Sequence, residues 1–153
     1  MKFPSTSLRG AALVAAVALS ACSSMSGMKP GSSSSTVMLG AQLDAKQEVP
    51  PNGSSATGSL EASFSKTTSV LKWKVTYSGL SGPATAGHFH GPALPGQNAG
   101  VVVPFNNPLS PIEGTATLTP GQIADLMAGK WYVNIHTAAN PGGEIRGQVT
   151  PKM

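Results

Sequence analysis

The chain has 153 residues, of which 10% are charged, and its formal net charge is +4. Its 18 glycines and 13 prolines are typical of a compact, turn-rich β domain and argue against long helices. The basic residues form no cluster, so nucleic acid is not an expected partner. A single cysteine excludes a disulfide within the chain. We therefore expect one domain that is held together by its hydrophobic core.

Residues 1–21 have the pattern of an export signal. Lys2 and Arg9 give a positively charged start, and an uninterrupted apolar run follows over residues 11–19. This run is shorter than the roughly 20 apolar residues that a membrane-spanning helix needs, but it has the length of a signal-peptide core. The segment is therefore predicted to be a cleavable signal peptide.

The apolar run ends at Cys22, the only cysteine of the chain, in the sequence LSAC. This ending resembles the lipobox of bacterial lipoproteins, which implies cleavage before Cys22 and attachment of acyl chains, palmitate among them, to this residue. Two or more acyl chains anchor a protein stably, whereas one gives only marginal binding. Ser23, where an aspartate would indicate inner-membrane retention, favours the bacterial outer membrane. The alternative is an ordinary secretory signal followed by an incidental cysteine.

Residues 22–36 are rich in serine and glycine, which is typical of a flexible tether. The folded domain is expected to occupy residues 37–153. The predicted chain is therefore a signal peptide, a lipidated tether and one domain.

Short segments separated by glycine and proline predict about eight strands in this domain. They are residues 37–43, 57–65, 70–77, 87–91, 101–105, 114–118, 131–137 and 144–149. The alternation is clearest in residues 70–77, where Leu71, Trp73, Val75 and Tyr77 share one face. A period of two with one apolar face indicates a half-buried antiparallel strand. Residues 66–69 are expected to join the second and third of these strands in a hairpin.

One short helix is predicted over residues 120–128. Thr119 suits the N-cap, Pro120 the first helical position and Gln122 the third, which together form a capping box. Gly129 suits the C-cap. Ile123, Leu126 and Met127 are expected to pack against the core.

These elements predict an all-β fold: a Greek-key-like antiparallel β-sandwich of about eight strands with one short helix. Phe64, Trp73, Phe89 and Trp131 are the aromatic residues expected to fill its core.

The chain has three histidines, His88, His90 and His136. His88 and His90 flank Phe89, so alternation places both imidazoles on the face opposite that core residue. His136 lies opposite the apolar positions of its own strand. If the two strands are neighbours, three imidazoles converge, and three neutral imidazoles suit copper or zinc. The alternative is that the histidines hydrogen-bond locally and hold turns.

Glu144 and Arg146 share the polar face of the last strand and are two further candidate binding residues. Arg146 is expected to form an ion pair with Glu144, Glu113 or Asp125, or to bind an anion. The sequence contains no Gly-x-Ser-x-Gly motif and no evident pair of catalytic carboxylates. No catalytic residue is therefore predicted.

Four segments carry a family resemblance: residues 43–51 (LDAKQEVPP), 88–93 (HFHGPA), 134–137 (NIHT) and 140–148 (NPGGEIRGQ). In this order they resemble the CHRD domain, the repeated module of chordin, over essentially residues 37–149. In animals that family supplies extracellular antagonists of growth factors, and in bacteria it occurs in secreted or anchored proteins. The growth-factor ligand is not carried over to a chain with a bacterial lipoprotein signal.

The resemblance and the signal together predict a binding module, not an enzyme, anchored in the bacterial envelope through its lipid. Its metal would be copper or zinc, bound by His88, His90 and His136. The alternative is a module with structural histidines that binds an envelope protein or a matrix polymer. A metal-dependent redox enzyme is a third hypothesis. The His-x-His strand also resembles copper/zinc superoxide dismutase, but the chain lacks that enzyme's cysteines and full ligand set, so the likeness is only an analogy.

Overall fold

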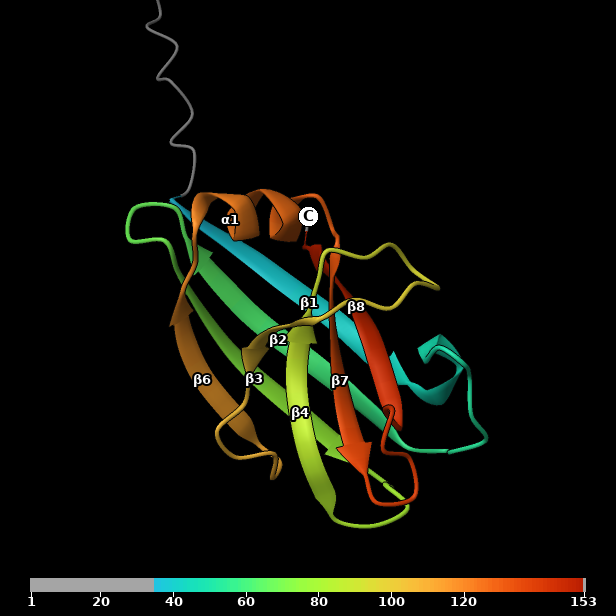
Figure 1. Cartoon of the computed structure of the whole chain (residues 1–153). Coiled ribbons are helices and arrows are strands. Elements are labelled where there is room, and N and C mark those ends of the chain that lie inside the picture. The colour runs from blue at the N-terminus through green and yellow to red at the C-terminus, as the bar shows by residue number, and fades with distance from the viewer. Residues whose placement is uncertain (1–34, 153) are drawn as a thin grey trace, which may run out of the picture. The chain divides into compact units, whose positions relative to one another are not determined.

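A computed structural model of the protein describes residues 35–152. Eight strands form one antiparallel sheet in the order β5-β4-β7-β8-β1-β2-β3-β6 (Figure 1). The strands are β1 (Thr36–Asp44), β2 (Thr57–Ser65), β3 (Val70–Ser78), β4 (Ala84–His90), β5 (Val101–Pro104), β6 (Ile112–Thr117), β7 (Trp131–Thr137) and β8 (Ile145–Pro151). The predicted all-β class, with eight antiparallel strands and one short helix, is confirmed.

The sheet curls around one hydrophobic core, so that β4, β7 and β8 face the strands from β1 to β3 and β6 (Figure 1). The indole of Trp73 on β3 meets the ring of Phe89 on β4 edge to face, with centroids 5.3 Å apart. Phe89 also lies 5.9 Å from Trp131 on β7. The meander β1-β2-β3 is as expected for a Greek-key-like sandwich, and so are the connections from β3 to β4 and from β5 to β6, which join strands that are not neighbours in the sheet. The predicted aromatic core, including Phe64, is confirmed.

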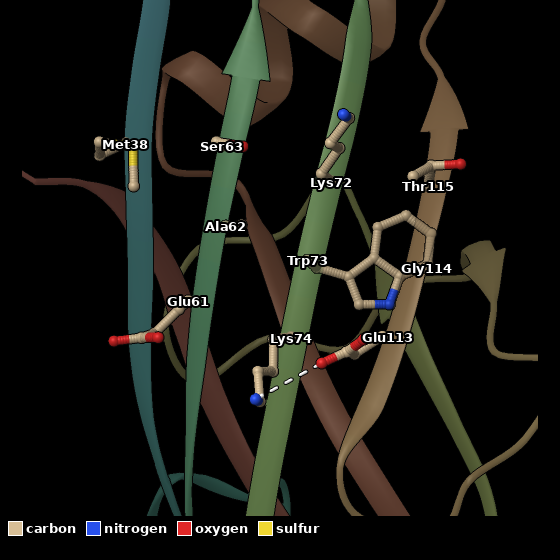
Figure 2. A pocket seen from close by; sticks show the side chains of 10 residues that line it. All are labelled: Met38, Glu61, Ala62, Ser63, Lys72, Trp73, Lys74, Glu113, Gly114 and Thr115. Carbon is tan, nitrogen blue, oxygen red and sulfur yellow. Dashed lines mark ion pairs between the residues drawn. The ribbon is translucent and has the colours of Figure 1, made fainter.

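Trp73 extends under its cross-strand partner Gly114 on β6. A Cβ atom at position 114 would overlap the indole ring, so glycine is required for this close approach. Figure 2 shows the ring beside Gly114 and, on the outer face of the same strands, the ion pair between Lys74 and Glu113 at 3.4 Å.

The helix α1 spans Pro120–Met127 and has the predicted capping box between Thr119 and Gln122. Leu126 is fully buried, and Ile123 and Met127 pack against the core as expected. The C-cap is Ala128, one residue earlier than predicted, because Gly129 adopts the positive φ of 69° that follows the cap. No helix in the described part of the chain is long and apolar enough to cross a membrane.

Several bounds differ from the sequence prediction, among them the start of β6, two residues earlier at Ile112, and the end of β8, two residues later at Pro151. β4 begins at Ala84, three residues earlier than expected, because its first residues pair with the end of β7. The segment after β1, for which no helix or strand was predicted, contains a short 3-10 helix, η1 (Ala45–Gln47). Asp44 caps it by accepting hydrogen bonds from the backbone N–H groups of Lys46 and Gln47.

The pairing of β4 with β7 is the part of the fold that assembles the histidines. In this antiparallel register His88 lies opposite Asn134, and His90 lies opposite Tyr132. His136 lies opposite Ala86, two residues before His88. The three histidines therefore project from adjacent strands on one face of the sheet, as the metal hypothesis requires.

Candidate metal centre

The three histidines form one compact cluster. One ring nitrogen from each of His88, His90 and His136 lies within 4.8 Å of the others. Nδ1 of His88 is 3.1 Å from Nε2 of His136. His90 is buried and the other two are half-buried, so the cluster lies at the protein surface with its deepest ligand already shielded from water.

Backbone carbonyls fix the orientation of two of the rings. Nδ1–H of His90 donates to the carbonyl of Ala99 at 2.9 Å, and Nδ1–H of His136 donates to the carbonyl of Pro141 at 3.0 Å. A carbonyl oxygen can only accept, so the one proton of each neutral ring is on Nδ1 and a lone pair is on Nε2. This arrangement, in which the second ring nitrogen binds a carbonyl, is the usual one for histidines that bind metals.

The distances between ligand atoms suit a small metal ion. Two nitrogens bound at 2.0–2.1 Å with angles between 90° and 109° are about 2.9–3.4 Å apart. The 3.1 Å separation of His88 Nδ1 and His136 Nε2 falls in this range. Two ligands on opposite sides of an ion can be at most about 4.2 Å apart. Binding by all three histidines therefore requires a small inward movement of any pair that is wider than this.

The surroundings of the cluster favour neutral imidazoles. Burial, together with the neighbouring His136 and His90, lowers the pKa of His88 from 6.5 to about 4. Burial is also the main cause that lowers the pKa of His90, and Arg146 contributes in the same direction. Both rings are therefore neutral at pH 7, with one nitrogen free of a proton, which is the form that binds metal ions.

Aromatic stacking fixes the orientation of the His90 ring. The ring of His90 stacks on Tyr132, with centroids 4.7 Å apart and an angle of 1° between the planes. The guanidinium carbon of Arg146 lies 3.4 Å from the centroid of the Tyr132 ring. β4 and β8 flank β7 on opposite sides, so Tyr132 separates the cation from the imidazole. His90 consequently has little freedom to rotate.

The predicted ion pair of Arg146 is not formed. Its guanidinium donates to the side-chain oxygen of Asn98 at 3.1 Å and to the carbonyl of Gln97 at 2.7 Å, and no salt bridge joins it to Glu144, Glu113 or Asp125 within the described residues. The expected ion pair is absent because the guanidinium stacks on Tyr132 and donates its hydrogen bonds to the loop after β4 instead. Arg146 is only 1% exposed, which favours a role in holding this loop.

Glu144 is fully buried, and its charge is stabilised by hydroxyl groups. Ser54 Oγ and the backbone N–H of Ser81 donate to Oε1, both at 2.7 Å, and Ser81 Oγ and Thr137 Oγ1 donate to Oε2, both at 2.6 Å. Burial raises its pKa, but these hydrogen bonds outweigh that effect and lower it from 4.5 to about 2. Glu144 therefore ties three segments together beside the loop that carries Pro141.

Sequence reasoning missed two polar residues beside the histidines. The side chain of Asn134, 2% exposed, contacts both His90 and His136. Glu48 is 4% exposed, and burial raises its pKa to about 7 against the opposing effects of the Val49 backbone, Arg146 and Asn134. Asn134 could have been identified, since it shares the face of His136, whereas Glu48 lies in the 43–51 segment of the family resemblance and nothing there links it to the histidines.

A hollow of about 570 Å³ lies on the outer face of β1, β2, β3 and β6 (Figure 2). Polar side chains and the apolar residues Met38, Ala62 and Trp73 line it, and none of the three histidines does. It brings together no set of ligands or reactive groups, so the histidine cluster remains the candidate site. The predicted lipidation site Cys22, the signal peptide and most of the tether lie outside the described residues.

The fold and the cluster together define a small antiparallel β domain with three converging histidines on adjacent strands. The family model of the CHRD domain matches residues 39–149, well over half of the chain. The chain therefore belongs to the CHRD domain family, as the resemblance indicated. Searches of curated proteins and of solved structures found no match.

The buried carboxylate of Glu144 predicts a loss of stability in acid. Its folded-state pKa lies below its ordinary value, so its contribution is complete above about pH 4.5 and is lost as the pH falls from 4.5 towards 2. We expect Glu144→Gln to lower the free energy of unfolding at pH 7 by on the order of 2 kcal/mol and to flatten its decline between pH 4.5 and 2. Urea unfolding at several pH values measures both effects. The exposed Glu61→Gln is the control, and an unchanged acid slope in Glu144→Gln would contradict the assignment.

Proposed function

We propose that this protein is a metal-binding module of the bacterial envelope that binds copper or zinc through His88, His90 and His136. The observation that carries the proposal is the convergence of three imidazoles, two of which have a lone pair on the nitrogen that faces the cluster. These lone pairs are assigned by the Nδ1–H bonds to the carbonyls of Ala99 and Pro141. A metal ion bound between the rings would replace the 3.1 Å contact between His88 Nδ1 and His136 Nε2.

The structural alternative accounts for the cluster less well. Histidines that only stabilise turns need one local hydrogen bond each, and such bonds do not require the three rings to lie close together. Here the chain's only three histidines lie together, and the low pKa of His88 reflects the cost of placing them so. Strongly shifted pKa values of this kind are more common at functional sites than elsewhere in proteins. A module that binds a protein or polymer partner would not require this convergence.

The donor set favours ions such as copper and zinc over magnesium and calcium, which prefer oxygen ligands. Imidazole nitrogen suits both ions, and the cluster offers no thiolate to select softer ones. Zinc in catalytic sites commonly has three histidines and an open fourth position. We propose binding, not catalysis, in keeping with the binding module that the CHRD family indicates.

The test is calorimetric titration of the purified protein with Cu(II), Cu(I) and Zn(II). We expect tight one-to-one binding that the His88→Ala/His136→Ala variant weakens by more than about 100-fold, since changes to residues behind the ligands alone cost about 10–100-fold. The matched control is Glu61→Ala/Glu113→Ala, which removes two exposed carboxylates on another face. Absence of binding by the folded wild type, or equal binding by the histidine variant, would overturn the proposal.

We also propose that the module is attached to the outer membrane through lipid on Cys22, which rests on the sequence pattern of residues 1–22. In cells fed labelled palmitate, we expect label on the wild type and none on Cys22→Ala. The variant should also leave the membrane fraction, because it has no acyl chain. Ser24→Ala in the adjoining tether is the control. Unlabelled wild type, or a Cys22→Ala variant that stays membrane-bound, would contradict the anchor.

A further inference from the structure

Asn134 occupies a position between two of the histidines that the three-histidine proposal does not explain. Its side-chain oxygen Oδ1 lies 3.1 Å from Nε2 of His90 and 3.0 Å from Nε2 of His136. The side chain is 2% exposed and shares the outer face of β7 with His136. The amide is thus buried at the point on which the ring nitrogens converge.

The hydrogen bonds around this point are not satisfied by neutral rings alone. The protons of His90 and His136 are on Nδ1, where each faces a carbonyl oxygen. Each Nε2 therefore carries a lone pair, and so does Oδ1 of Asn134. Nδ1 of His88 can donate to Nε2 of His136, but Nε2 of His90 and Oδ1 of Asn134 face one another with no proton between them, and a cation bound there would remove this conflict.

Glu48 determines which end of the amide faces the histidines. The side chain of Asn134 lowers the pKa of Glu48, which requires its NH2 end to face that carboxyl and its Oδ1 to face the cluster. Oε1 of Glu48 is buried and has no hydrogen-bond partner among the described residues, so the carboxyl has spare capacity to accept. Gly143 lies against this carboxyl, since a Cβ there would overlap it. Glu48 is consequently held in place behind Asn134.

We propose that Oδ1 of Asn134 is the fourth ligand of the bound ion and that Glu48 is the positioning residue that holds the amide in the ligand orientation. This inference rests on the proposed metal-binding function and deepens it. Three imidazole nitrogens and one amide oxygen, without sulfur, suit Cu(II) and Zn(II) better than Cu(I). The separations of Oδ1 from the two Nε2 atoms, 3.1 and 3.0 Å, are those of neighbouring ligands on one ion.

The test compares Cu(II) and Zn(II) binding by wild type, Asn134→Ala and Asn134→Asp. Asn134→Ala should weaken both affinities by about 10–100-fold and shift the Cu(II) electron paramagnetic resonance spectrum, whereas Asn134→Asp should restore binding because it supplies another oxygen ligand. A purely structural asparagine would not be rescued by aspartate. Glu48→Gln should weaken binding by less than Asn134→Ala, because glutamine can also donate to the amide and permit its reversal. Asn107→Ala, in the loop after β5, is the control.

The outcomes separate this inference from the proposed function. No binding by the wild type overturns the metal-binding function itself. Wild-type binding with unchanged affinity and spectrum in Asn134→Ala overturns the ligand role of Asn134 and leaves the three-histidine function standing. Unchanged binding by Glu48→Gln overturns the positioning role alone. If Asn134→Ala does not fold, the Asn134 side-chain amide signal of the wild type is followed by NMR during Zn(II) titration. A large shift supports ligation, and an unmoved signal overturns it.

Discussion

The pairing of β4 with β7 determines both the core and the candidate site. On its inner face β7 carries Trp131, Val133 and Ile135, which are fully buried. Burial of side chains of this size stabilises a fold by roughly 1.5–3 kcal/mol each. A slip of one residue would expose all three and turn the polar residues of β7 into the core. The register that buries the apolar face therefore also fixes His136 and Asn134 beside the histidines of β4.

The loops that follow these strands complete the site without supplying ligands. The loop after β4 brings the carbonyl of Ala99 to His90, and Arg146 holds that loop through Gln97 and Asn98. The loop between β7 and β8 brings the carbonyl of Pro141 to His136. Loops anchored by buried charged groups hold the rings in one orientation before any ion binds. Preorganisation of this kind increases affinity because less freedom is lost on binding.

Much of the fold could be predicted because it depends on local patterns. Alternation of apolar and polar residues gave β2 and β7 with the observed bounds, and the capping residues gave the start of α1. The same alternation placed all three histidines on faces opposite the core. Whether they would meet depended on which strands are neighbours, and that is a long-range property which a single sequence does not show.

The contacts that orient the histidines could not be predicted from the sequence, because they also join segments that are far apart in the chain. Arg146 was expected to pair with an acid, but the loop after β4 and the ring of Tyr132 surround its guanidinium instead. Glu48 reaches Asn134 from a segment 86 positions earlier in the chain. Every residue has a backbone carbonyl, so the sequence does not show that those of Ala99 and Pro141 contact the histidines. Such contacts become visible only when the strands are paired and the loops are closed.

The protonation of the histidine rings in the metal-free protein tests the account most directly. Nitrogen NMR of the imidazoles at pH 7 distinguishes a proton on Nδ1 from one on Nε2. The account predicts a proton on Nδ1 of His90 and of His136, and a large change at Nε2 of both when one equivalent of Zn(II) is added. Rings protonated on Nε2, or Nε2 signals that Zn(II) leaves unchanged, would contradict it.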